Sequence, residues 1–202
     1  MTSPAPITAP DPAVPAAPAA PAVPAAPDLT ALCTAASRAG LTVQSSARWP
    51  ESDTDRQVRP LAGFIESSFS PLLAEVANRT LAAAGRREPV PGRVTAIVMV
   101  TALGDVTSAN WVASAVDAGR RVLPLMFFQS VPNAVAGYLA ARWQLTGPVA
   151  CVGSIGAGLD ATATLIEDAD ADEALVLWAE VAVTDGDRDR AAAVLVTRKE
   201  RP

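Results

Sequence analysis

A chain of 202 residues is long enough for one domain with a real core, and half of its residues are hydrophobic while 18% are charged. No apolar run reaches the roughly eighteen residues that span a bilayer, so we expect a soluble, cytoplasmic protein without membrane contact. The formal net charge of −5 argues against nucleic acid as a partner, because nucleic-acid-binding proteins cluster Lys and Arg on one face.

The chain has no histidine, and Lys199 is its only lysine. General acid–base chemistry at neutral pH is therefore poorly provided for. Cys33 and Cys151 lie far apart, without the paired spacing of a zinc site or a disulfide framework. We expect neither a metal nor another cofactor.

The first 28 residues differ in composition from the rest of the chain. Proline recurs every two or three residues with alanine between, which can neither propagate a helix nor bury a core. This composition predicts a disordered, semi-rigid tether over residues 1–28, followed by a single domain over residues 29–202.

From Leu29 onward, apolar runs alternate with amphipathic segments that end at glycine or proline. Helices are expected at 29–40, 70–85, from Asp105 or Thr107 to Ala118, 132–144 and 155–168. Strands are expected at 41–50, 93–101, 148–154, 173–181 and 191–199, with polar loops at 51–60 and 184–190. Strands that alternate with helices predict an α/β fold whose mostly parallel sheet has helices on both faces.

Three other patterns carry little functional weight. The glycine spacing of GSIGAG, residues 153–158, is wrong for a dinucleotide-binding loop, which also belongs in a first βαβ unit. The acidic run DADADE, residues 168–173, is interpreted as a solvated helix-to-strand loop and not as a metal site. The four tryptophans are scattered singly, which is typical of core or interface positions.

The segment from Arg120 to Gly158 resembles the β-ketoacyl synthase family, in which an Arg-rich turn leads to Pro-Asn, a helix with Ala-Gly, and Gly-Pro before the nucleophile strand. The matching residues are Arg121, Pro124, Pro132, Asn133, Ala136, Gly137, Gly147 and Pro148. A looser likeness extends over Pro60 to Lys199. The resemblance implies a thiolase-like fold and covers the N-terminal half of a complete synthase.

In that family the nucleophilic cysteine lies at a strand-to-helix elbow, where a helix N-terminus lowers its pKa. The matching position here is Gly156, eight residues after Pro148. Cys151 falls inside the predicted strand 148–154, so we expect it to be buried and inert. The family's catalytic histidines lie in the C-terminal half and have no counterpart, so no catalytic residue is assigned.

A half-length relative without a nucleophile resembles the chain-length-factor type of subunit, closest to the short proteins found beside ketosynthases in polyene-type pathways. The resemblance implies a heterodimer with a complete ketosynthase, an acyl carrier protein as a further partner, and a role in polyketide or fatty-acid biosynthesis. It places Met126, Phe127, Phe128 and Gln129 at the partner's acyl pocket, although both rings could instead belong to the core.

Two alternatives to this function stay open. The chain could be an acyltransferase that uses Cys151 or Ser154 and is active only with a second chain. It could also be a scaffold or binding module that kept the fold without the acyl chemistry.

Overall fold

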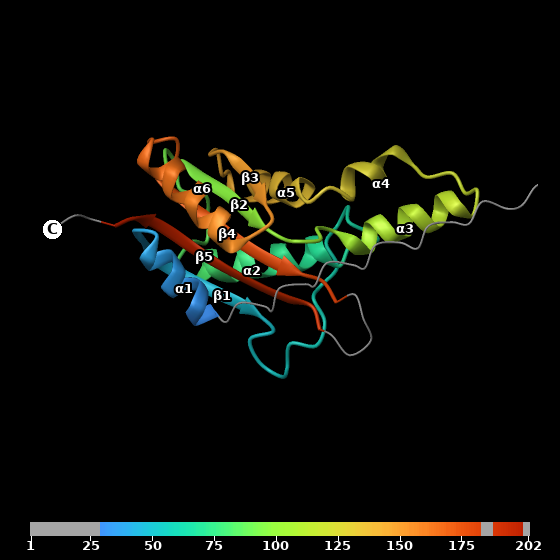
Figure 1. Ribbon diagram of the computed structural model, residues 1–202, viewed down its shortest axis with the longest axis horizontal. Helices are drawn as coiled ribbons and strands as arrows, with labels where there is room; N and C mark the ends of the chain where they lie inside the picture. The colour runs from blue at the N-terminus through green and yellow to red at the C-terminus, as the bar shows by residue number, and fades with distance from the viewer. Residues whose placement is uncertain (1–28, 183–187, 200–202) are drawn as a thin grey trace, which may run out of the picture.

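The sheet and its helices are described by a computed structural model over residues 29–182 and 188–199 (Figure 1). Its strands are β1 Leu41–Trp49, β2 Thr95–Val100, β3 Val149–Val152, β4 Glu173–Glu180 and β5 Arg190–Arg198. Its helices are α1 Leu29–Arg38, α2 Phe69–Ala83, α3 Val106–Asp117, α4 Pro124–Gln129, α5 Asn133–Trp143 and α6 Ile155–Glu167. The predicted tether and most of the predicted loop 184–190 lie outside the described residues.

The five strands form one mixed sheet in the order β1-β5-β4-β2-β3. The pairs β2–β3 and β2–β4 are parallel, whereas β5 is antiparallel to both of its neighbours. The prediction of a mostly parallel sheet is thus only partly right. Only nine residues lie between the end of β4 and the start of β5, too few for a parallel crossover connection of a dozen or more residues, so the two consecutive strands pair antiparallel.

Both faces of the sheet are buried at its centre, where side chains alternate between two separate cores. Residues such as Ile97, Met99 and Leu175 pack with helices α2 and α5. Their neighbours Val98, Val100 and Val176 pack with α1 and α6 on the other face. Every residue of β2 and β4 is buried, which explains why these strands are nearly continuous apolar runs in the sequence.

Several predicted helix ends are confirmed in physical detail. Gly40 and Gly85 follow α1 and α2 with φ angles of 78° and 76°, which glycine adopts without steric cost. Asp105, and not Thr107, caps α3, because its carboxylate accepts hydrogen bonds from the backbone N–H and the hydroxyl of Ser108.

Gly147 of the Gly-Pro pair is required by the sheet. A Cβ there would lie 2.5 Å from the carbonyl carbon of Thr95, and the Gly147 N–H donates to the Thr95 oxygen over 3.1 Å. The backbone before β3 therefore passes directly against the start of β2, where only glycine fits.

The interpretation of the acidic run 168–173 as a solvated loop is wrong for its last residue, Glu173. Glu173 is 1% exposed, pairs with Arg86 and Arg93, and accepts a hydrogen bond from Thr95. Within the described ranges no group of acidic, Cys or His side chains could hold a metal ion. Nor does any helix there have the length and apolar character needed to cross a membrane.

Candidate functional site

The elbow between β3 and α6 holds the residues that the sequence suggested as possible nucleophiles. Gly156 lies in the first turn of α6, and a Cβ built on it meets no atom within 4 Å. A side chain would therefore fit there, so packing does not dictate the glycine. Ser154 is the N-cap of α6, and its hydroxyl accepts a hydrogen bond from the Ala157 N–H over 3.3 Å.

Cys151 is exposed, so the prediction that it is buried within the sheet is wrong. The reason is that, among the described strands, β3 pairs only with β2 and forms the edge of the sheet, where Val149 and Cys151 are exposed. Partial burial of the thiol nevertheless raises the pKa of Cys151. Because the thiolate is the reactive form, this shift makes the cysteine a poor nucleophile at neutral pH.

Helices α3 and α4 form an arm, residues 106–131, that extends beyond the sheet along the long axis of the molecule (Figure 1). Of the four residues that the family resemblance placed at a partner's pocket, Met126 and Gln129 are buried within the arm. Phe127 and Phe128 are 51% and 71% exposed, which excludes them from the core of this chain. Sequence analysis did not predict α4 as a helix.

The two rings are among several large apolar side chains of the arm that are exposed. The others are Val116, Leu123, Leu125 and Val131. So many exposed apolar side chains within one short segment favour an interaction site, because monomeric proteins rarely leave large apolar areas in contact with water. We call these residues the arm patch.

Helix α5 lies between the arm and the edge strand β3 along the upper side of the molecule in Figure 1. The exposed residues of α5 include Asn133, Gly137 and Ala141, one turn apart, and the last two carry little or no side chain. Val149 of β3 is 43% exposed. We call the arm patch, this side of α5 and the β3 edge the arm face.

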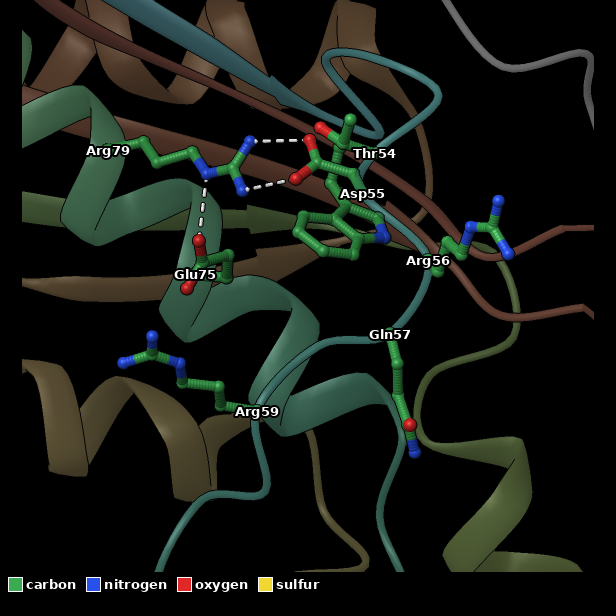
Figure 2. Close-up of a pocket in the computed structure, with 8 residues that line it drawn as sticks. Thr54, Asp55, Arg56, Gln57, Arg59, Glu75 and Arg79 are labelled. Atoms are coloured by element: carbon green, nitrogen blue, oxygen red, sulfur yellow. Dashed lines mark hydrogen bonds and ion pairs between the residues drawn. The ribbon is translucent and has the colours of Figure 1, made fainter.

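A groove lies on another part of the molecule, beside the loop that follows β1. Its cavity of about 570 Å³ is lined by Trp49, Thr54, Asp55, Arg56, Gln57, Arg59, Glu75 and Arg79. Figure 2 shows the Arg79 guanidinium facing the Asp55 carboxylate, with N–O distances of 2.8 and 2.9 Å, and its Nε donates to Glu75 over 2.8 Å. The guanidinium also lies 4.8 Å above the Trp49 ring.

This groove holds an internal clamp and not a convergent anion site. The Arg79 hydrogen bonds hold the pKa of Asp55 well below its usual range, and the Asp55 carboxylate in turn raises the pKa of Arg79. Arg56 and Arg59 extend away from the pair in different directions (Figure 2). The clamp fastens the loop after β1 to α2. Only the Glu75 to Arg79 spacing hinted at it in the sequence.

Sequence comparison finds no relative: no family model matches the chain, and no curated protein matches it. Solved structures do match its fold. A chain of a ketosynthase (ApeO) in complex with its chain length factor (ApeC) from Xenorhabdus doucetiae gives a TM-score of 0.62 at 17% identity, over 79% of this chain and 79% of that chain.

Two further structures are similar over a smaller share of their own length. The ishigamide ketosynthase/chain length factor gives a TM-score of 0.56 at 21% identity, over 76% of this chain and 49% of that chain. An oxazolomycin ketosynthase domain of Streptomyces albus gives 0.50 at 16% identity, over 64% and 27%. This chain thus spans about half the length of the ishigamide chain. It spans about a quarter of the oxazolomycin chain.

The chain therefore has a thiolase-like fold of the ketosynthase type, as the resemblance in sequence predicted. Two of the matched structures are ketosynthases determined with chain length factors. At these identities the likeness concerns the fold, and function has to be argued from this chain's own surface.

We predict that Asp55→Asn lowers the melting temperature at neutral pH, because it removes the carboxylate that Arg79 holds. Since folding lowers the pKa of Asp55, its contribution is full above the ordinary Asp value of about 4 and is lost as pH falls further. The difference between wild type and variant should therefore shrink on acidification. Melting curves between about pH 7 and pH 3 test this.

Asp53→Asn, a change at an exposed acid of the same loop, is the matched control and should leave the melting temperature unchanged. A gap between wild type and Asp55→Asn that stays constant across the pH range would contradict the clamp.

Proposed function

We propose that this chain is a noncatalytic subunit of the chain-length-factor type, which binds a complete ketosynthase in polyketide or fatty-acid assembly. The observation that carries the proposal is the exposed arm face, which lies beside an elbow that offers no activated nucleophile. The fold likeness to a structure of a ketosynthase with its chain length factor supports it. An acyl carrier protein is a further partner of the proposed assembly.

The elbow argues for a noncatalytic role. Gly156 supplies no nucleophile, Ser154 is occupied as a helix cap, and the raised pKa of Cys151 disfavours its thiolate. The chain has no histidine that could polarise a thioester or protonate a leaving group. Each of these observations weighs against the alternative that this chain carries the acyl group itself.

The arm face suits a protein partner of matching shape. Phe127 and Phe128 project from a short helix as rigid apolar anchors, which often contribute most of the binding free energy at interfaces. The β3 edge offers unpaired backbone groups for strand addition, and the small residues of α5 allow a partner's backbone to come close. In the proposed complex the two rings close the far end of the ketosynthase's acyl tunnel.

The first test concerns chemistry. The purified chain should acquire no covalent acyl group from an acyl thioester, because its candidate nucleophiles are absent, capped or protonated. Intact-protein mass spectrometry after incubation measures this directly. A stoichiometric adduct that maps to Cys151 or Ser154 would overturn the noncatalytic assignment and favour the acyltransferase alternative.

The second test concerns the tunnel. Phe127→Ala and Phe128→Ala should each change the chain's stability by less than about 1 kcal/mol, since exposed side chains contribute little to the folded state. In complex with a complete ketosynthase, the same variants should lengthen the product, because a missing ring leaves room for further units. Product masses and melting curves give both answers.

Stable variants that bind the ketosynthase and leave product length unchanged would refute the tunnel closure. A loss of roughly 3–5 kcal/mol would instead show that the rings are packed as core residues.

A matched pair of substitutions tests the interface itself. Val149 on β3 and Val90 in the turn before β2 are both 43% exposed, but they lie at different parts of the fold. Val149→Arg should weaken binding of the ketosynthase by at least about tenfold, since it buries an unpaired charge. Val90→Arg should leave the affinity unchanged. Equal effects of the two variants would contradict the assignment of the β3 edge to the interface.

A further inference from the structure

The arm has too small a core of its own to set its direction. Only Ser108 and Ala115 of α3, and Met126 and Gln129 of α4, are buried. The arm therefore has to be oriented where it leaves the sheet, in the segment from Thr101 to Asp105 that follows β2.

This root segment is held by one carboxylate from the neighbouring strand. Glu180 ends β4, and its Oε1 accepts a hydrogen bond from the Ala102 N–H over 2.6 Å. The Thr101 hydroxyl donates to the same oxygen over 3.5 Å and accepts from the Gly104 N–H over 2.9 Å. The Glu180 side chain thus connects directly to Thr101 and Ala102 of the root, and through Thr101 to Gly104.

The root has other contacts besides Glu180. The Thr101 N–H donates to the Val152 oxygen of β3 over 3.0 Å, which fixes only the first residue of the root. A Cβ on Gly104 would be 3.1 Å from the ring of Pro132, so the outgoing and returning ends of the arm touch. The hydroxyls of Ser68 and Thr107 are 2.8 Å apart, in an exposed hydrogen bond. None of these contacts joins the root to β4. The Glu180 side chain does so from a residue that is 7% exposed, through a part-buried hydrogen bond to the Ala102 N–H.

Glu180 is costly to keep where it is. The residue is 7% exposed, and its Oε2 has no hydrogen-bond partner among the described residues. A buried acceptor without a donor destabilises the fold, so stability alone does not account for a carboxylate at this place.

We propose that Glu180 is a positioning residue that fixes the direction of the arm, and so presents Phe127 and Phe128 to the partner. The claim that the rings are presented to a partner rests on the proposed function. The claim that Glu180 fixes the direction of the arm concerns the isolated chain alone. It requires an acceptor at Oε1 and does not require the negative charge.

The experiment measures the arm directly, by spin labels in the full chain. Labels are attached to Val116→Cys on the arm and Glu167→Cys on α6, both exposed, with Cys33 and Cys151 changed to Ser. Pulsed electron spin resonance then gives the distribution of distances between them. Glu180→Ala should broaden this distribution markedly, whereas Glu180→Gln should leave it narrow, because the amide oxygen still accepts from Ala102.

Glu173→Ala is the matched control, because Glu173 is a buried carboxylate at the other end of the same strand. It should lower the melting temperature without broadening the distribution. Should Glu180→Ala fail to fold, Thr101→Val removes the hydroxyl that relays the contact to Gly104 and should broaden the distribution in its place.

A narrow distance distribution in Glu180→Ala would overturn the proposal. If that variant does not fold, a narrow distribution in Thr101→Val would do the same. Broadening by Glu173→Ala equal to that by Glu180→Ala would also overturn it. Binding to the ketosynthase should follow the same order, with a loss of about tenfold for Glu180→Ala and none for Glu180→Gln. If wild type binds no ketosynthase, the proposed function fails while the distance measurement still decides the role of Glu180.

Discussion

Burial of β2 and β4 on both faces is the constraint on which the rest of the structure depends. Helices α2 and α5 cover one face and α1 and α6 cover the other, so the two faces of the sheet's centre are filled by this chain alone. What is left for a partner lies at the margins: the β3 edge, the outer side of α5, and the arm. The chain's capacity to interact is therefore concentrated where its own core ends.

The arm follows from the same constraint. The chain between β2 and α5 finds no free face of the sheet to cover, and it runs outward as two helices with few buried side chains. The apolar residues of the arm are exposed because the core of the domain lies too far away to cover them. An arm whose direction Glu180 fixes, as proposed, would lose little conformational freedom on binding, which favours a specific complex.

Local pattern was sufficient for most elements and insufficient for their placement. Apolar runs and glycine stops located the strands and most helices, since these signals arise within a few residues. They could not show that β3 is an edge strand, because the run containing Cys151 is the same whether one or two strands flank it. The local patterns also did not lead to the prediction that β5 is antiparallel, although they predicted a polar loop, and no helix, between the last two strands.

Some residues of the candidate site could be predicted from the sequence, and others could not. Phe127, Phe128 and the glycine at position 156 were identified from a resemblance in order and spacing, which a sequence carries. The contacts Glu180 to Ala102 and Arg79 to Asp55 join residues far apart in the chain, so no spacing indicates them. α4 was missed because a proline-led apolar stretch of six residues is too short for helical periodicity to appear.

The central claim is that the arm face is the surface that meets a ketosynthase. Hydrogen exchange of this chain, with and without a complete ketosynthase as partner, tests that claim most directly. The account predicts slower exchange at residues 123–131 and 149–152 in the complex, with no change in the loop at 51–60. Protection confined to that loop, or no protection anywhere at saturating partner concentration, would contradict it.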